Sequence, residues 1–401
     1  MRWLGFIGLL RDIYGPGLPD LDKIQRQGLL AVKIGQTFAL RADFLDEAKC
    51  RHLAQLYRRT LSLPPEDVDR LLRGTPPGWR DAFTSIEREP LASASVGQVH
   101  RAVLDDGAAV VVKLIKGDFA QRFVRDVRSV RRLADLAIFF YPKLAKVADP
   151  AGILAHIEEY TLAELDLRNE VANGEILRGI RDNNQGRYDL SHLAFPKVYK
   201  ELSDAKVLVS EFIDGQTFDE LLERGQLPYE ELLKLFSIHG FFMFGAGTFH
   251  GDIHPGNIIL KGGDLYFIDT GAISRVGDRI RTGLFRFFEA LAWDDYAQCA
   301  HWINRMAESG IAGKAYDSYR EKFLELYKDF SGATVSQVSL TKMMMDTIKL
   351  AVNAGMVFEK GMYPVIKSLM YLDGMVLRCK PDAVLARDMR GFIGDFQKVM
   401  A

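Results

Sequence analysis

The chain has 401 residues, of which 48% are hydrophobic, enough to bury a sizeable core in more than one domain. Its formal net charge is −1 and it holds no basic nucleic-acid motif, so the sequence argues against a nucleic-acid partner. The cysteines, Cys50, Cys299 and Cys379, are far apart and lack C-x-x-C spacing. This pattern indicates a reducing compartment, the cytoplasm, and argues against a structural zinc site.

No apolar run reaches the roughly 18 residues that span a bilayer, so the sequence predicts no transmembrane segment. The opening segment, residues 1–11, is too short for a secretory signal. We expect it to form a helix that packs on its own protein, and a place in a lipid interface is the alternative. Membrane contact is therefore expected to be peripheral.

An apolar helix is expected around Lys33 and Gln36, because apolar residues flank both at 29–32 and 38–40. A lysine on a buried helix needs a carboxylate partner, since unpaired burial of a charge is costly. The alternative is a lysine whose ammonium group reaches solvent. Residues 44–57 are expected to form a further helix.

Residues 91–99 predict a strand, a turn and a strand in the register of the glycine-rich loop that covers nucleotide phosphates in kinases. Ala92 and Ala94 take the first two glycine positions, and Gly97 keeps the third. Alanine should stiffen the loop and restrict how a triphosphate fits beneath it. The predicted nucleotide contacts in this loop are Ala92, Ser93, Ala94, Ser95, Val96, Gly97 and Val99.

After a turn at 105–107, an apolar strand over 108–113 ends at Lys113, in the place of the kinase lysine that neutralises the α- and β-phosphates. The alternative is an edge-strand lysine that discourages aggregation. Residues 121–141 then predict a helix with a basic face that ends in aromatic residues. That face is either solvated and salt-bridged or in contact with anionic lipid headgroups.

Residues 153–180 show helical spacing and carry several acids. Glu170 is the expected partner of Lys113, and Glu164 with Asp166 forms a separate E-x-D pair. Strands over 195–199 and 206–212 should complete a small sheet. Glu211 and Ile213 then lie in the segment whose backbone would meet adenine.

The segment 250–257 reads His-Gly-Asp-Ile-His-Pro-Gly-Asn and follows an apolar stretch, 236–249, that predicts a buried helix. Asp252 and Asn257 have the spacing of the kinase catalytic loop, in which the aspartate orients the attacking hydroxyl and the asparagine binds magnesium. After a short strand, Asp269 stands where the D-F-G aspartate binds metal. A surface loop of turn residues is the alternative.

The sequence around Asp269 departs from the protein-kinase pattern in two ways. Thr270 stands where kinases carry phenylalanine, so the apolar plug that switches their activity is missing. No Ala-Pro-Glu follows Asp269, and residues 280–285 already predict a helix. The intervening stretch is too short for an activation segment that docks peptides.

Taken together, the motifs resemble the UbiB/AarF family of atypical kinase-like proteins, which is associated with ubiquinone biosynthesis and related isoprenoid-lipid metabolism. The resemblance runs from position 33 to position 271. It rests on five motifs in order: Lys33-Ile34-Gly35-Gln36, Ala92-Ser93-Ala94-Ser95, Glu164-Leu165-Asp166, the segment His250 to Asn257, and Asp269-Thr270-Gly271.

The resemblance implies an α+β, bilobal protein-kinase-like fold with a small antiparallel β lobe, a large helical lobe and an N-terminal helical extension. We expect the extension over residues 1–90, the small lobe over 91–213 and the helical lobe over 214–401. The K-x-G-Q helix would fold over the site as a regulatory element. Lys33 and Gln36 would then approach Glu164 and Asp166 and take the place of a protein substrate.

The function implied is that of an atypical kinase or ATPase that binds ATP or ADP with Mg²⁺ in an occluded kinase-like cleft. Asp252 and Lys113 would be catalytic, and Asn257 and Asp269 would hold the metal. The partner would be an isoprenoid lipid or quinone precursor, in the cytoplasm or at a membrane surface. Two alternatives remain: a nucleotide-binding scaffold or sensor with little catalysis, and a small-molecule phosphotransferase of the aminoglycoside type.

Overall fold

The computed structural model describes residues 3–39, 45–57, 62–76, 78–117, 119–140, 150–358 and 362–400. The chain divides into two compact units. The first unit holds Met1–Val171 and Lys197–Phe212, and the second holds Ala172–Pro196 and Ile213–Ala401. The extension expected over 1–90 therefore belongs to the same unit as most of the expected small lobe, and residues 172–196 group with the helical part.

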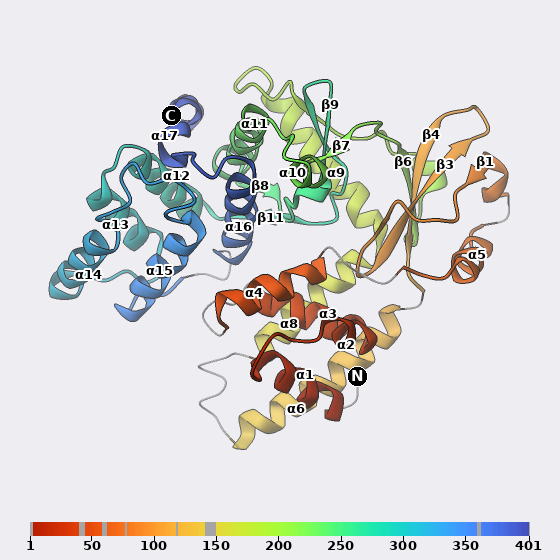
Figure 1. Cartoon of the computed structure of the whole chain (residues 1–401), viewed down its shortest axis with the longest axis horizontal. Coiled ribbons are helices and arrows are strands. Elements are labelled where there is room, and N and C mark those ends of the chain that lie inside the picture. The colour runs from red at the N-terminus through yellow and green to blue at the C-terminus, as the bar shows by residue number, and fades with distance from the viewer. Residues whose placement is uncertain are drawn as a thin grey trace. The chain divides into compact units, whose positions relative to one another are not determined.

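The first unit contains an antiparallel sheet in the order β1-β3-β4-β6, with β2 paired to β3 (Figure 1). Its strands are β1 (Phe83–Ile86), β2 (Ala92–Ser93), β3 (Gly97–Leu104), β4 (Ala109–Ile115) and β6 (Val207–Glu211). In β4, Val110, Val112 and Leu114 are buried in the core, so alternation puts Lys113 on the opposite face. The strand runs past Lys113, farther than the sequence pattern predicted.

Seven helices of the first unit and three 3₁₀ turns are described: α1 (Trp3–Tyr14), α2 (Leu21–Arg26), α3 (Leu29–Ala39), α4 (Glu47–Leu53), η1 (Ala54–Tyr57), α5 (Pro65–Arg73), η2 (Trp79–Ala82), α6 (Phe119–Phe140), α8 (Pro150–Glu164) and η3 (Lys200–Leu202). Helix α3 packs against α4, α6 and α8 around a second core (Figure 1). Gly35 allows α3 to pack closely against η1 as well, because a Cβ there would lie 2.6 Å from the Leu56 side chain.

The acidic segment 153–180 was expected to be one helix, and this is wrong. Helix α8 ends at Glu164, and α9 (Leu167–Asn184) begins after a break. Asp166 causes the break, because its carboxylate accepts a hydrogen bond from the Arg168 backbone N–H at 3.1 Å and so starts the new helix. The division between the two units falls within α9, after Val171.

The strand expected over 195–199 does not form, and the first sheet lacks it. Val198 forms a single β-bridge with Ser210. The neighbouring strand β5 (Leu193–Ala194) pairs instead in the second unit, parallel to β10. Pro196 cannot donate a backbone hydrogen bond, which explains why a ladder does not continue through this segment.

The second unit contains a sheet in the order β5-β10-β9-β7 and the pair β8-β11. The strands are β7 (Gln216–Thr217), β8 (Thr248–His250), β9 (Ile258–Lys261), β10 (Asp264–Phe267) and β11 (Ile273–Arg275). The helical elements are α10 (Phe218–Glu223), α11 (Tyr229–Gly240), α12 (Asp278–Ala292), α13 (Tyr296–Met306), α14 (Gly313–Leu326), α15 (Leu340–Asn353), α16 (Met362–Cys379), α17 (Leu385–Asp388) and α18 (Arg390–Met400). The expected helix over 280–285 is thus present as part of α12.

The buried helix expected over 236–249 is only partly correct. Helix α11 ends at Gly240, a π-helical turn follows at Phe241–Ala246, and β8 then leads into the catalytic-loop motif. Gly247 makes the turn into this strand with a φ of 68°, a backbone conformation that glycine adopts without strain. A strand, β8, therefore leads directly into the segment 250–257.

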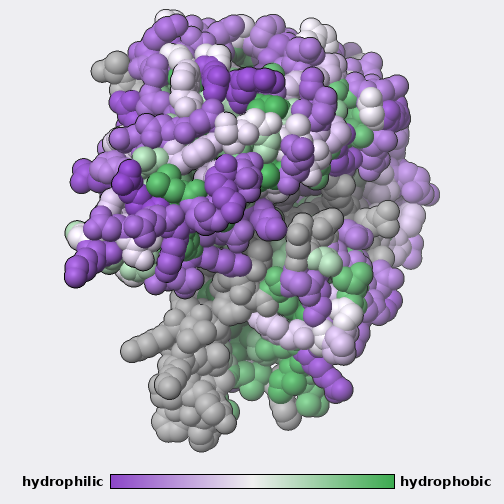
Figure 2. All heavy atoms as spheres, turned by 60° about the vertical axis from the view of Figure 1, so that its left-hand side comes forward, coloured by the Kyte–Doolittle hydropathy of each residue, from purple (hydrophilic) through white to green (hydrophobic). Residues whose placement is uncertain are grey.

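No helix in the described part of the chain has the length and apolar character that crossing a lipid bilayer demands. In α1, Leu9 and Ile13 are fully buried, whereas Leu4 and Ile7 are 65% and 51% exposed. Figure 2 shows apolar surface in its lower part, at the height where Figure 1 places α1. Residues 1 and 2, Phe44 and Tyr141, which belong to segments predicted above, lie outside the described residues.

Candidate active site

The first unit holds the predicted phosphate-binding lysine. Lys113 lies in the middle of β4, between Val99 of β3 and Leu208 of β6. Its Nζ donates to Oε2 of Glu170 at 2.7 Å, and Glu170 lies buried in the first turn of α9. A carboxylate near a helix N-terminus is favoured by the helix dipole, and it holds the ammonium group at the face of the sheet away from the core.

The alanine-rich loop is fixed by a lysine that sequence reasoning missed. Lys116, just past β4, donates from Nζ to the Ser93 hydroxyl and to the Ala94 carbonyl, both at 2.7 Å. Its backbone N–H donates to Val96 O at 2.8 Å. Burial lowers the pKa of Lys116 to about 8. The signal available was a second lysine three residues after Lys113, but nothing in the sequence pointed to its partners.

Two further features restrict the conformation of the alanine-rich loop. A Cβ at Gly97 would lie 2.8 Å from the Leu114 carbonyl, so glycine is required by the close approach of β3 to β4. Val96 is buried in the core formed by the N-terminal helices. Ala92 and Ala94 are exposed, and Ser95 is half-buried. The loop is therefore held by Lys116 and Val96 as well as stiffened by its alanines.

The K-x-G-Q helix, α3, makes one of the two expected acidic contacts. The Lys33 ammonium group forms an ion pair with Oε2 of Glu164 at the end of α8, and it lies 5.4 Å from the centre of the Tyr160 ring. Lys33 is 6% exposed, so the pair is largely removed from water. Gln36 donates from its side-chain amide to the Leu56 carbonyl at 3.0 Å.

The expected pairing of Asp166 with Lys33 is wrong. Asp166 forms a bidentate contact with Arg168, at 2.9 Å and 3.2 Å from Nε and at 2.6 Å from Nη2. The hydrogen bonds of Arg168 hold the pKa of Asp166 below its ordinary value. Because Asp166 starts α9, its side chain turns to that helix, and Glu164 alone faces Lys33.

The expected adenine-binding segment follows β6. Glu211 ends that strand, with its N–H donating to Lys197 O at 2.8 Å and its carboxylate accepting from Lys197 N at 3.1 Å. Ile213 is buried and is the first residue of this stretch that belongs to the second unit. Their adenine contacts stay a prediction.

In the second unit, His250 joins the catalytic-loop motif to the predicted metal-binding segment. Its Nδ1 accepts from the Asp252 N–H at 3.1 Å, and its Nε2 donates to the Asp269 carbonyl. These two bonds require the proton on Nε2. Burial lowers the pKa of His250, with partial compensation from Asp252 and Asp269, so the ring is neutral and structural.

Asn257 and Asp269 are brought together by the β9-β10 hairpin. Ile268 N donates to Asn257 O at 3.0 Å, so the residues flanking the hairpin face each other. The Asn257 side-chain NH₂ donates to the Asp252 carbonyl at 3.0 Å, which turns its carboxamide oxygen away. Asp269 Oδ1 accepts from Gly271 N at 2.9 Å. One carboxylate and one amide oxygen suit Mg²⁺, which usually takes its remaining ligands from phosphates and water.

Asp252, the predicted base, is paired with a residue that the sequence did not indicate. Lys367 Nζ, from α16, lies 2.8 Å from Asp252 Oδ1. Burial would raise the pKa of Asp252, but the charge and hydrogen bond of Lys367, with smaller help from His254 and His250, outweigh it and lower the pKa. The carboxylate is therefore ionised at neutral pH.

Thr270, which replaces the usual phenylalanine, packs against α9. Its side chain is nearly buried, and a Cβ added to Gly174 would lie 3.0 Å from Thr270 Oγ1. Asn173 also donates to the Gly271 carbonyl at 3.3 Å. Helix α9 therefore approaches Thr270 so closely that there is little room for even a methyl group at position 174.

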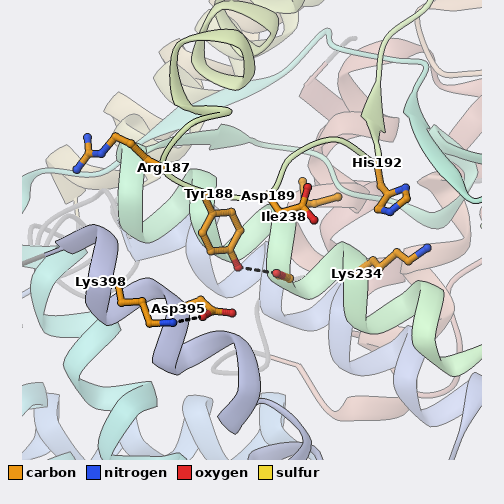
Figure 3. A pocket seen from close by; sticks show the side chains of 9 residues that line it. Arg187, Tyr188, Asp189, His192, Lys234, Ile238, Asp395 and Lys398 are labelled. Carbon is orange, nitrogen blue, oxygen red and sulfur yellow. Dashed lines mark hydrogen bonds and ion pairs between the residues drawn. The ribbon is translucent and has the colours of Figure 1, made fainter.

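A separate cavity of about 480 Å³ lies elsewhere in the second unit (Figure 3). Lys398 pairs with Asp395 at 2.9 Å, and Tyr188 shares a hydrogen bond of 2.6 Å with Ser237. Burial raises the pKa of Tyr188 to about 12. The cavity includes none of the site residues predicted from sequence, and several of its charged groups bind residues outside the lining, such as Lys234 with Glu231 and His192 with Asp264, so we assign it no function. Its lining consists of Arg187, Tyr188, Asp189, His192, Lys234, Ser237, Ile238, Asp395 and Lys398.

The structure thus groups the predicted residues into two sets. The first unit carries Lys113 with Glu170, the alanine-rich loop, and Lys33 with Glu164. The second unit carries Asp252, Asn257 and Asp269, linked through His250. In the predicted scheme, the first set would supply cations and backbone for phosphates, and the second would supply a base and metal ligands.

Comparison with known proteins identifies the family and the fold of the chain. A family model described as the ABC1 atypical kinase-like domain matches residues 55–303. A protein from Clostridium pasteurianum, described as uncharacterized and located in the hydrogenase 1 5′ region, is 24% identical over 88% of this chain and 65% of its own length. A probable protein kinase UbiB from Shewanella piezotolerans is 26% identical over 93% of this chain and 68% of its own length.

The chloroplastic protein ACTIVITY OF BC1 COMPLEX KINASE 8 from Arabidopsis thaliana is 31% identical over 67% of this chain and 35% of its own length. The chain therefore spans less than two thirds of the clostridial and Arabidopsis proteins. Among solved structures, the complex of Rv3197 with erythromycin from Mycobacterium tuberculosis has a TM-score of 0.53 at 22% identity, over 86% of this chain and 90% of that chain. With the family match, this similarity confirms the expected kinase-like α+β fold with a small antiparallel β lobe.

Proposed function

The chain belongs to the ABC1 atypical kinase-like family, and from this premise we propose that it is an ATP-dependent phosphotransferase or ATPase. The observation that carries the proposal is the hydrogen-bonded arrangement of His250, Asp252, Asn257 and Asp269. A turn without a catalytic role has no need for an ionised aspartate, an oriented amide and a second carboxylate in one network. Lys113, held by Glu170, supplies the cation for the nucleotide phosphates.

In the proposed reaction, an acceptor hydroxyl or a water molecule gives its proton to Asp252 as its oxygen bonds to the γ-phosphorus of ATP. The bond from that phosphorus to the bridging oxygen breaks, and ADP leaves. Asn257 and Asp269 would hold Mg²⁺, which neutralises charge on the phosphates when it is bound. His250 keeps the two loops in register throughout, because its neutral ring bonds both.

For the acceptor, we propose an isoprenoid lipid or quinone precursor. The support is the resemblance to the UbiB proteins together with the loss of a peptide-docking segment. Helix α12 begins at Asp278, soon after Asp269. The ion pair of Lys33 with Glu164 gives further support, because it fixes the K-x-G-Q helix within the first unit. A small acceptor needs no extended docking surface.

A nucleotide-binding scaffold is the second candidate. The observation in its favour is Lys116, whose ammonium group binds the Ser93 hydroxyl and the Ala94 carbonyl and so fixes the loop that would otherwise adjust to the phosphates. Such a protein would bind nucleotide and turn it over slowly. The two functions differ in whether ATP turnover depends on Asp252.

Turnover of ATP, with and without Mg²⁺, anionic liposomes and isoprenoid quinone precursors, tests the proposal. Asp269→Asn should abolish Mg²⁺-dependent stabilisation by nucleotide in a thermal titration, because it removes charge from the metal site. Asp252→Asn should retain nucleotide binding and lose about 100-fold or more in turnover. Asp278→Asn, at the exposed start of α12, serves as the matched control. Equal turnover in Asp252→Asn and wild type would favour the scaffold.

A further inference from the structure

Lys367 lies beside Asp252, the candidate base. No sequence motif predicted this contact. Lys367 lies on α16, beyond residues 55–303 that the family model matches. Its side chain is 9% exposed, and its Nζ is 2.8 Å from Oδ1 of Asp252. Oδ1 is itself buried, whereas the Asp252 side chain as a whole keeps 27% exposure. One carboxylate oxygen is thus committed to the lysine, and the exposure falls on the rest of the side chain.

Helix α16 holds this lysine rigidly. Val365, Leu372 and Val376 of the helix are buried in the main core, and α16 packs against α10, α11 and α15. Asp373, also on α16, accepts hydrogen bonds from the Ser339 hydroxyl at 2.7 Å and from the Leu340 N–H at 3.2 Å, at the start of α15. Lysine has a flexible stem, so a fixed helix and a buried site are what make its position definite.

Aromatic contacts also link Lys367 to the catalytic loop. Lys367 Nζ lies 5.7 Å from the centre of the Tyr371 ring, one helical turn further along α16. The Tyr371 ring in turn meets the His254 ring edge-on at 5.4 Å. His254 begins the turn that carries Asn257, with its Nδ1 accepting from Gly256 N at 3.0 Å. Lys367 therefore contacts the loop through Asp252 and, by way of Tyr371, through His254.

The charge of the lysine matters because the pair is largely removed from water. A buried carboxylate without a counter-charge is strongly destabilised, and a lysine in this position repays much of that cost. The charged and titratable groups that act on Asp252 in the described part of the chain include Lys367 from α16 and His254 and His250 from the catalytic loop. His250 is neutral, whereas Lys367 places a positive charge 2.8 Å from Oδ1 of Asp252.

We propose that Lys367 is a positioning residue of the active centre, which fixes the carboxylate of Asp252 so that its second oxygen faces the acceptor hydroxyl. This inference rests on the proposed phosphotransferase or ATPase function. It assigns a catalytic contribution to a helix outside the matched family segment. A fixed charge that need not reorganise during reaction is the usual source of such an effect.

The first test does not depend on activity. Thermal unfolding is measured for wild type, Lys367→Met, Asp252→Asn and the double variant, without nucleotide. Each single change should lower the midpoint by roughly 5 °C, because it breaks a buried pair. The double variant should also fall by roughly 5 °C, rather than by the sum of roughly 10 °C, because contacting residues couple. Additive shifts would show that the two side chains do not interact and would overturn the proposal.

The second test separates positioning from simple structural support. At a temperature where all variants stay folded, Lys367→Met should lower kcat about 100-fold and leave KM for ATP within about twofold. Lys367→Arg, which keeps the charge, should recover at least about tenfold of that loss. Lys380→Met, which removes an exposed lysine over the Tyr229 ring just after α16, is the matched control and should leave kcat unchanged.

The outcomes distinguish the two proposals. Unchanged kcat in Lys367→Met, in a wild type that turns over ATP, would overturn the positioning role and leave the proposed function standing. A wild type with no turnover under any condition would overturn the proposed function and the catalytic role together, whereas coupling in the unfolding cycle would still establish the ion pair. No rescue by arginine would show that the position serves packing only, and this would also overturn the proposal.

Discussion

At the scale of single residues, Gly174 decides how closely α9 can approach the segment that carries Asp269. The Cβ of an alanine at this position would lie 3.0 Å from Thr270 Oγ1, tighter than ordinary contact. Thr270 follows Asp269 directly, so displacement of the threonine would move the predicted metal ligand.

We expect Gly174→Ala to destabilise the protein by roughly 1 kcal/mol and to weaken Mg²⁺-dependent nucleotide binding, because overpacking displaces Thr270. Gly179→Ala on the same helix is the matched control, since nothing lies within 4 Å of the Cβ it would add. That change should stabilise the protein by about 0.5–1 kcal/mol through helix propensity alone. Urea unfolding and nucleotide titration measure both effects. Equal behaviour of the two variants would contradict the close contact.

Lys116 gives a prediction about pH. Burial lowers its pKa to about 8 in the folded chain, whereas in the unfolded chain it titrates near its ordinary 10.5. Between these values the unfolded chain binds more protons, so the contribution of Lys116 to stability rises with pH. Relative to Lys116→Met, the wild type should gain on the order of 3 kcal/mol between about pH 7.5 and pH 10.5.

Urea unfolding of wild type and Lys116→Met across this range isolates the effect, because other titrating groups cancel in the difference. Lys322→Met, at an exposed position of α14, removes the same charge as a control. A constant difference between wild type and Lys116→Met over the whole range would show that the lysine is not desolvated in the folded protein.

At the scale of elements, the pairing of α3 with α8 is the contact that holds the K-x-G-Q helix. We expect Lys33→Ala to lower stability by roughly 3 kcal/mol, because it leaves Glu164 partly buried without its cation. A double-mutant cycle with Glu164→Ala should show coupling beyond about 0.5 kcal/mol. The same cycle on Lys23 and Asp12, a pair at 2.7 Å in which Lys23 is 50% exposed, should show less, because exposed pairs contribute little.

Sequence patterns identified the parts of the site whose residues follow one another along the chain. The apolar run over 108–113 predicted the strand that carries Lys113, now part of β4, and the motif over 250–257 predicted the loop that carries Asp252 and Asn257. The pattern failed where one residue serves two structures. Asp166 fits the E-x-D motif, but it also starts a helix, and this local role directs its side chain to Arg168.

The partners missed by sequence are the ones brought together by packing alone. Lys367 is separated from Asp252 by several helices, and its place on α16 shows only the ordinary spacing of a core helix. Lys116 follows the strand that carries Lys113, yet its contacts with Ser93 and Ala94 depend on how the β2-β3 turn closes. Periodicity gives the face of an element, but it does not say which side chain from another element meets that face.

At the scale of the whole molecule, the exposed apolar residues of α1 and the arginines of α6 suggest where a membrane would bind. Leu4, Ile7 and Tyr14 of α1 recur at helical spacing and are about half exposed or more, and Leu18, four residues after the helix, is 58% exposed. Helix α6, which packs against α1, carries exposed arginines at 122, 125, 128 and 132. Apolar insertion and attraction to anionic lipid act together in peripheral binding.

We expect the chain to co-sediment with anionic vesicles at low salt and to be released as salt rises, because salt screens the arginines. Leu4→Glu with Ile7→Glu should abolish binding. Val352→Glu with Leu377→Glu, at exposed apolar positions of the second unit, is the matched control and should bind as wild type does. Loss of binding in both pairs, or in neither, would place the lipid contact elsewhere.

The two lysines that pair with site carboxylates have a practical consequence for fragment design. A minimal fragment cut at residues 55–303, the limits of the family match, would contain Glu164 and Asp252 but would lack both Lys33 and Lys367. In this fragment Glu164 and Asp252 would lack the lysines that pair with them in the full chain. Each unpaired carboxylate would lower the stability of the fragment. Inactivity of such a fragment would therefore report the missing ends rather than the chemistry of the intact chain. The smallest piece fit for a kinetic assay runs from before α3 to beyond α16.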